Sequence, residues 1–188
     1  MNSSPAASPA RYALLYHNLC VEMKPIKSTI EILAFKSLGR PIDKLWVNWA
    51  VEMLMAGFET ENLIILAGES SPYDQSELQV LTEKIFNELD INYSDKEKII
   101  NDFVCYTIDK ALNKEVDSFK VLSILTDIYV ELDYQTDYKD FYFLHYAKEE
   151  LDEMGTQWYW EGADKSNIDQ IVETTFIKWK ATHQNNSA

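Results

Sequence analysis

Acidic and aromatic residues concentrate between Tyr129 and Trp160. These 32 residues hold ten of the 24 aromatic side chains and eight of the 31 acids, and only Lys139 and Lys148 offset those acids. Tyr and Trp with few neighbouring lysines are typical of the centre of a protein-binding surface. The same composition is also typical of a core edge beside a solvated face, and both interpretations stay open.

A helix over 137–154 would divide this stretch into two faces, because each residue advances by about 100°. Phe143, Ala147, Leu151 and Met154 then form a core stripe. The opposite side carries a candidate partner-binding set: Tyr138, Tyr142, Tyr146, Glu149 and Glu153, with His145 and Asp152 beside them. One interpretation is a helix covered on both sides, with its phenol tips in water. The other is a docking surface for a basic partner, in which the rings supply contact area and the acids steer the encounter.

Two tryptophans lie in an expected turn after this helix. Trp158, Tyr159 and Trp160 follow Gly155 closely. Such a cluster is most often a plug over one end of the core. The alternative is that Trp158 and Trp160 form the energetic centre of the same partner-binding surface.

The carboxylates of this region also form two short motifs. Glu149, Glu150 and Glu153 make an EExxE pattern, and Glu161 and Asp164 make an ExxD pattern. These five residues resemble the motifs of all-α nucleoside triphosphate pyrophosphohydrolases of the MazG type. The resemblance implies acids on two helices that hold Mg²⁺ against phosphates. This chain departs from that pattern, because only seven residues separate the motifs and the ExxD falls in an expected loop.

Other catalytic groups are few. His17, His145 and His183 lie in different parts of the sequence, and none follows a glutamate by three residues as a di-iron helical bundle requires. The sequence has no Gly-rich phosphate loop, no GxSxG, no HExxH and no Cys/His zinc spacing. His145 and Glu149 are four residues apart, so an ordinary helical ion pair is expected. We therefore expect no catalytic residue, no bound metal and no cofactor.

The formal charge of −14 is uneven, since residues 1–40 carry +3 and the remaining 148 residues carry −17. Nucleic acids and anionic membranes both require a basic footprint, so the charge argues against either partner and favours a basic protein. No apolar run approaches the length of a membrane span. Cys20 and Cys105 form no paired framework, and the first residues do not have the order of a secretion signal. These features predict a cytoplasmic protein.

The hydrophobic period is helical along most of the chain, and only five Gly and five Pro interrupt it. We expect helix N-caps at Asp74 and Ser94, a helix whose first turn contains Pro41, and left-handed helix stops at Gly57 and Gly68. A further amphipathic pattern predicts a helix within 12–23. Two segments, Trp49–Gly68 and Gln157–Ile171, resemble uncharacterised bacterial all-helical proteins. That resemblance implies an all-α bacterial domain and no functional residue.

Together these patterns predict an all-α protein, a single irregular helical bundle or α-α array of about eight helices. We expect a disordered tail at 1–10, one domain at 11–184 and a frayed C-terminus at 185–188. The predicted function is that of a non-enzymatic, acidic interaction protein. Its concrete form is an immunity- or antitoxin-like protein that binds and neutralises a basic protein. The alternatives are a Mg²⁺-dependent pyrophosphohydrolase-like enzyme and a helical scaffold without a discrete site.

Overall fold

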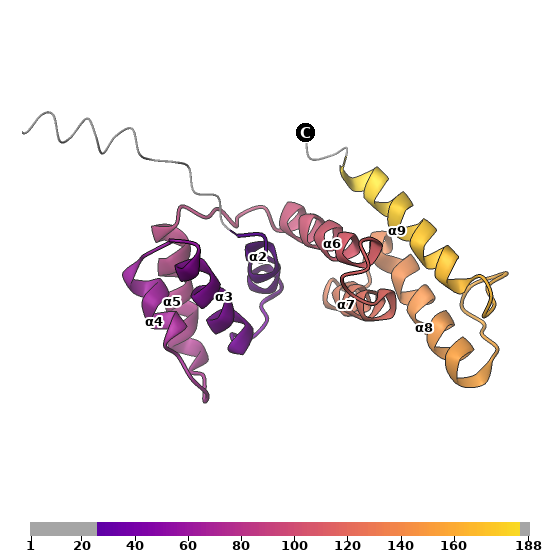
Figure 1. Ribbon diagram of the computed structural model, residues 1–188, viewed down its shortest axis with the longest axis horizontal. Coiled ribbons are helices and arrows are strands. Elements are labelled where there is room, and N and C mark those ends of the chain that lie inside the picture. The colour runs from indigo at the N-terminus through magenta and orange to yellow at the C-terminus, as the bar shows by residue number, and fades with distance from the viewer. Residues whose placement is uncertain (1–25, 185–188) are drawn as a thin grey trace, which may run out of the picture.

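The computed structural model describes residues 26–184, and within this range the chain forms helices and no strand (Figure 1). The α-helices are α2 (Thr29–Leu38), α3 (Lys44–Met55), α4 (Glu61–Ala67), α5 (Gln75–Glu88), α6 (Lys96–Leu112), α7 (Ser118–Glu131), α8 (Lys139–Met154) and α9 (Ile168–Gln184). A short 3-10 helix, η1 (Thr136–Tyr138), precedes α8. The all-α prediction is confirmed. The helix expected within 12–23 and the tails at 1–10 and 185–188 lie outside the described residues, and the single domain at 11–184 stays a prediction.

Aspartate side chains cap the starts of four helices. The carboxylates of Asp43, Asp74, Asp95 and Asp117 accept backbone N–H groups at the first turns of α3, α5, α6 and α7. Such caps satisfy donors that have no partner inside the helix. The predicted cap at Asp74 is confirmed. The prediction of Ser94 is wrong by one residue, and Pro41 lies before α3 rather than in its first turn, because Asp43 caps the helix at Lys44.

The two predicted glycine stops differ. Gly57 follows α3 with a φ of 93°, so its left-handed conformation is confirmed. Gly68 has a φ of −88° and is right-handed, so that prediction is wrong. The Gly68 N–H donates hydrogen bonds to the carbonyls of Ile64 and Ile65. Helix α4 therefore ends without a left-handed residue at this position.

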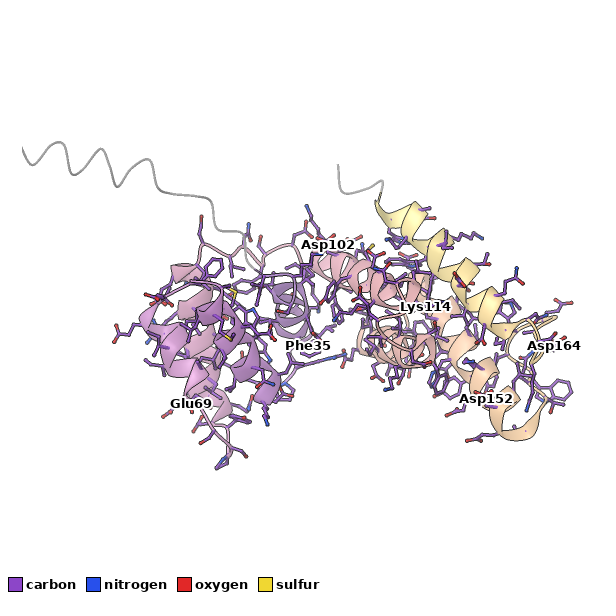
Figure 2. All side chains as sticks on the ribbon, viewed as in Figure 1. Phe35, Glu69, Asp102, Lys114, Asp152 and Asp164 are labelled. Carbon is purple, nitrogen blue, oxygen red and sulfur yellow. The ribbon has the colours of Figure 1, made fainter. Side chains whose placement is uncertain are left out.

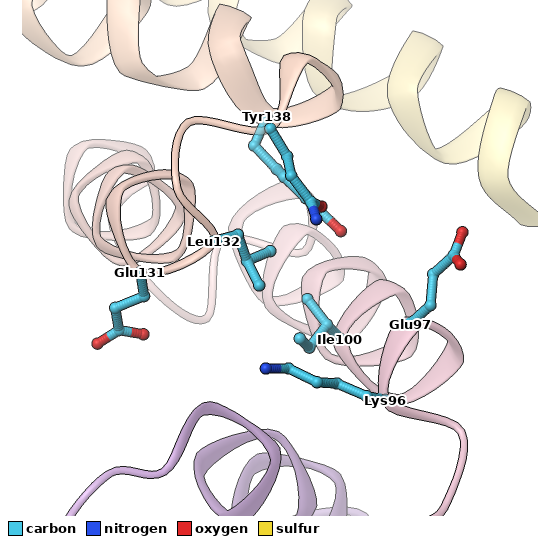
Figure 3. A pocket seen from close by; sticks show the side chains of 7 residues that line it. Lys96, Glu97, Ile100, Glu131, Leu132 and Tyr138 are labelled. Carbon is cyan, nitrogen blue, oxygen red and sulfur yellow. The ribbon is translucent and has the colours of Figure 1, made fainter.

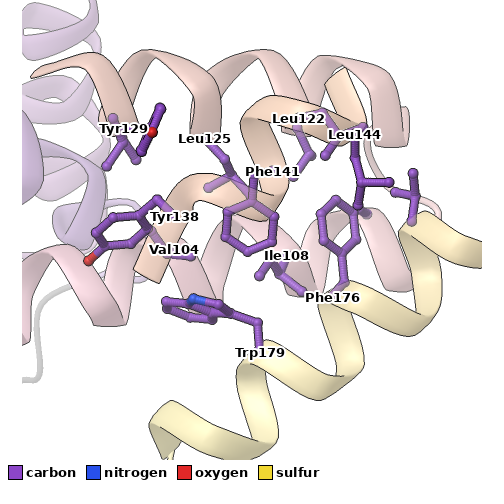
Figure 4. Packing of buried hydrophobic residues seen from close by; sticks show 14 of the residues in the cluster. Val104, Ile108, Leu122, Leu125, Tyr129, Tyr138, Phe141, Leu144, Phe176 and Trp179 are labelled. Atoms are coloured by element: carbon purple, nitrogen blue, oxygen red, sulfur yellow. The ribbon is translucent and has the colours of Figure 1, made fainter. Parts of the chain in front are cut away.

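Buried side chains form two hydrophobic clusters. The N-terminal core is built by α3, α4 and α5 together with Ile32, and it encloses the aromatic rings of Trp46, Trp49 and Phe86. The C-terminal core is built by α6 to α9 with Ala34, and Phe141, Phe176 and Trp179 meet within it (Figure 4). Helix α2 therefore supplies a buried residue to each cluster.

Helix α2 also joins the two halves through partly buried and charged side chains. Leu33 and Phe35 pack against both cores. Near the end of α2, the Lys36 Nζ lies 2.8 Å from a carboxylate oxygen of Glu83 on α5. Just after α2, the Arg40 guanidinium donates two bonds of 3.0 and 2.9 Å to the two carboxylate oxygens of Glu131 on α7. The end of α2 is thus fixed to one helix of each half.

Candidate functional site: an aromatic row on α7 and α8

A continuous row of tyrosine rings runs over the surface formed by α7, α8 and the loops that follow them. In order, this aromatic row consists of Tyr134, Tyr129, Tyr142, Tyr146 and Tyr159. Successive ring centroids are 5.3, 5.2, 4.8 and 5.4 Å apart. These separations are typical of favourable edge and offset ring contacts.

The row is assembled by helix packing and by one folded loop. Tyr142 and Tyr146 are four residues apart on α8 and therefore adjacent on one face. Tyr129 reaches them from the last turn of α7, which packs along α8. Tyr159 comes from the loop at 155–167 and stacks on Tyr146 with an interplanar angle of 30°.

Gln157 holds this loop in shape. Its side-chain amide N–H groups donate to the carbonyls of Trp160 and Ala163, at 2.6 and 3.0 Å. Its side-chain oxygen accepts the backbone N–H groups of Tyr159 and Trp160, both at 2.8 Å. One glutamine therefore satisfies four backbone groups and presents Tyr159 to the row.

The row passes from a buried centre to exposed ends. Tyr129 is buried, Tyr142 and Tyr146 are half-buried, and Tyr134 and Tyr159 are exposed. Next to Tyr159, the side chain of Trp158 is 90% exposed. The two tryptophans of the loop therefore differ, because Trp160 is half-buried against the C-terminal core and matches the interpretation of a core plug.

His145 connects the row to a further ring. Its imidazole stacks on Phe119 of α7 with centroids 4.8 Å apart and an interplanar angle of 11°, and it also contacts Tyr146. Burial lowers the pKa of His145, while the charges of Glu149 and Asp127 oppose that change. The ion pair expected between His145 and Glu149 does not occur among the described residues, because the ring lies flat on Phe119 and its buried Nδ1 has no hydrogen-bond partner.

Negative charge surrounds the row. Residues 117–167 contain twelve acids and four lysines, a net charge of −8. Asp152 and Glu153 are exposed near the end of α8, and Glu149 is half-buried beside the rings. Burial raises the pKa of Tyr146, and the neighbouring Tyr142 and the charge of Glu149 add to that rise. The hydroxyl of Tyr146 is therefore held in its neutral form beside the Glu149 carboxylate.

Tyr138 does not belong to this surface, contrary to the sequence prediction. Its side chain is only 3% exposed, and its hydroxyl donates a 2.8 Å hydrogen bond to the Asn101 side chain of α6. Its ring lies 6.0 Å from that of Trp179, and burial strongly raises its pKa. The prediction failed because it assumed one helix from residue 137, whereas Tyr138 lies in η1 and α8 begins at Lys139.

The expected core stripe of α8 was also partly wrong. Ala147 and Leu151 are buried as expected, but Phe143 is half-buried and Met154 is exposed. Phe141 and Leu144 take their places, because α8 contacts α9 as well as α7 and this turns a different face inward. The ring of Phe143 instead lies between Tyr142 and Tyr159, beside the aromatic row.

Sequence reasoning did not single out several members of the site. Tyr129, Tyr134 and Tyr159 fall within the acid- and aromatic-rich stretch, so composition contained a signal for them. Phe119 had no such signal, since only the packing of α7 against α8 brings it to His145.

The five carboxylates of the EExxE and ExxD motifs do not assemble into a metal site. Among the described residues, no three His, Cys, Asp or Glu side chains are arranged to hold a metal ion. The Asp164 carboxylate instead accepts the backbone N–H and the hydroxyl of Ser166, which lower its pKa. Figure 2 shows Asp164 in the loop, apart from Asp152 on α8. The structure therefore gives no support to the hydrolase alternative.

A cavity of about 540 Å³ opens where α6, the end of α7 and η1 meet (Figure 3). Its charged lining consists of Lys96, Glu97 and Glu131, and Glu131 is already paired with Arg40. The hydroxyl of Tyr138 at its edge is committed to Asn101. The lining contains no histidine or cysteine, so this cavity offers no imidazole and no thiol nucleophile.

None of the helices in residues 26–184 combines the length and the apolar character that crossing a membrane requires. Comparisons with protein-family models, with curated proteins and with solved structures found no match to this chain.

Proposed function

We propose that this chain is a non-enzymatic protein-binding protein that docks a basic partner on the aromatic row. The observation that carries the proposal is the row itself, which ends in solvent at Tyr134 and at Tyr159 beside Trp158. Large aromatic side chains near the centre of an interface supply most of its binding energy. The acids around the row specify a partner rich in Lys and Arg.

The packing of the rings also favours binding. Tyr142 and Tyr146 already contact each other and their neighbours in the free chain. Association therefore costs little additional side-chain entropy at these positions, which is the advantage of a preorganised surface. The acids at Glu149, Asp152 and Glu153 accelerate the encounter at low salt, and the rings then slow dissociation.

In its concrete form, this proposal describes an immunity- or antitoxin-like protein that neutralises a basic toxin. The acids would pair with the groups that such a toxin uses to bind phosphates, and nothing would be turned over. The expected compartment is the cytoplasm, and the free thiol of Cys105 suits a reducing environment. Co-expression with the partner would test this form, because the wild-type chain should restore growth that the partner alone prevents.

The first experiment identifies the partner through the most exposed ring. A photo-crosslinking amino acid replaces Trp158 in one chain and Ile177, an exposed residue of α9, in another. We expect position 158 to trap one basic protein that position 177 does not trap. The trapped protein is then purified, and its Kd for the wild-type chain is measured by calorimetry.

The second experiment assigns the affinity to the row. W158A/Y159A removes two loop rings whose side chains are exposed, so the fold should persist. We expect the Kd to rise at least about tenfold, as is usual when central aromatic residues are removed. M55A removes an equally exposed apolar side chain from the other half and should leave the Kd unchanged. An acidic partner, or equal affinity for the two variants, would contradict the proposal.

A further inference from the structure

A second surface feature lies in the other half of the molecule, where residues of α4, α5 and their connection line a groove. Figure 1 shows the positions of α4 and α5. The groove is open and has a volume of about 650 Å³. Its apolar lining consists of Ile65, Pro72, Leu78, Val80 and Leu81. Nothing in the aromatic row or its loop contributes to it, so the two features are separate.

The groove leaves aliphatic side chains in solvent. Ile65 is 46% exposed and Val80 is 56% exposed, and Ile64 beside them is also exposed. Helix α4 buries only Leu63 and Leu66 against the rest of the N-terminal core. Ile64 and Ile65 leave about half of their surface in solvent, and that part gains no hydrophobic stabilisation from folding. Clustered exposed aliphatic residues in a groove are typical of a binding site for another apolar surface.

Three acids and one base line the groove, so its charge favours a basic occupant. Glu69 and Asp74 lie in the connection between α4 and α5, Glu77 lies in the first turn of α5, and Lys84 lies further along α5. Neither Glu69 nor Glu77 forms an ion pair within residues 26–184. Residues 41–95 contain eleven acids and only two lysines, a net charge of −9. An anionic segment would be repelled here, and a basic one would be attracted.

We infer that this groove is a second docking site, which binds a basic amphipathic helix of another protein. Apolar residues at helical spacing enter the groove between Ile65 and Val80, as in other helix-in-groove complexes. Lysine or arginine residues on the flanks of that helix meet Glu69 and Glu77. The site is independent of the aromatic row, so the chain would hold two partners, or two segments of one partner, at opposite halves.

The test uses a synthetic helical peptide of about 18 residues, with leucines on one face and lysines on the other. A second peptide has glutamate at every lysine position. Binding of each labelled peptide to the full chain is measured by fluorescence anisotropy. We expect the lysine peptide to bind and the glutamate peptide not to bind.

Two matched double variants assign the site. I65T/V80T makes the groove polar while it keeps β-branched side chains on the same helices. V51T/I177T makes the same two exchanges at exposed positions, 40% and 54% exposed, that line neither the groove nor the row. We expect the first variant to weaken peptide binding about tenfold or more and the second to change it less than about twofold.

Three outcomes would overturn the inference. The first is equal binding of the lysine peptide by both double variants. The second is a loss of affinity only in W158A/Y159A, which would assign peptide binding to the aromatic row. Sedimentation equilibrium is the third measurement. If the wild-type chain dimerises and I65T/V80T is monomeric, the occupant is a second copy of this chain.

Discussion

The two halves of the molecule have similar charge and helical content, but they place their aromatic rings differently. Residues 41–95 carry −9 and residues 117–167 carry −8. In the N-terminal half, Trp46, Trp49 and Phe86 are buried together, and the exposed apolar residues are aliphatic. In the C-terminal half, rings extend from the core out to Trp158. Charge alone therefore does not distinguish two binding surfaces, whereas ring placement separates an aromatic face from an aliphatic groove.

The largest expected effects test whether the halves form one cooperative unit. F86A in the N-terminal core and F176A in the C-terminal core remove fully buried rings of the same kind. Each should lower the free energy of unfolding by about 3–5 kcal/mol. Because α2 contributes to both cores, we expect a single urea transition, observed by circular dichroism, that both substitutions shift.

Two separate transitions, of which each variant moves only one, would show that the halves unfold independently. In that case the single domain at 11–184 would have to be divided near α2. The tryptophan fluorescence of the wild-type chain provides the control, because Trp46 and Trp49 report on one half and Trp179 reports on the other.

A smaller effect separates structural tyrosines from surface tyrosines. Y138F removes the hydroxyl that donates to Asn101 and leaves a partly buried acceptor without its partner. This should cost about 1–2 kcal/mol of unfolding free energy. Y146F, in the aromatic row, should cost less than about 0.5 kcal/mol, since no hydrogen bond joins its hydroxyl to another described residue. Equal losses in the two variants, measured by urea unfolding, would mean that the row is as much a part of the architecture as Tyr138.

The fold could be predicted from the sequence because its signals are local. The helical hydrophobic period along most of the chain indicated an all-α fold, and Asp74 could be recognised as a cap from its neighbours alone. Errors occurred at the ends of elements. Asp95 rather than Ser94 caps α6, and one turn of 3-10 helix moved Tyr138 from the expected surface into the core.

The candidate site could be predicted only in part, because contacts between helices and loops assemble it. The helical spacing of Tyr142 and Tyr146 placed them together on one face, and they do contact each other. The position of Tyr159 depends on four hydrogen bonds made by Gln157, and no pattern in the sequence indicates such a folded loop. Residues that meet across helices or loops need the packed structure.

A third effect concerns the charged connection between the halves. Arg40 and Glu131 form a two-point ion pair whose side chains are only partly exposed. A double-mutant cycle with R40A, E131A and R40A/E131A should give a coupling energy of about 1 kcal/mol, near the upper range for surface pairs. The coupling should fall in high salt, because counterions screen the pair. A coupling near zero would leave the apolar contacts of α2 as the connection that matters.

The smallest effect is a pH dependence in the C-terminal half. Burial against Phe119 holds the pKa of His145 below its ordinary value, so the unfolded chain binds this proton more readily than the folded chain. His145 therefore contributes stability that is fully present above its unfolded pKa of about 6.5 and is lost as the pH falls below that value, through the lower pKa of the folded chain. H145F keeps an aromatic ring on Phe119 and removes the titration. Between about pH 7.5 and pH 5.5 we expect the wild-type chain to lose more unfolding free energy than H145F, because only the wild-type chain takes up a proton at position 145 on unfolding. Equal losses would mean that the imidazole is solvated in the folded chain, and the rings beside the aromatic row would then be more loosely packed than those of the N-terminal core.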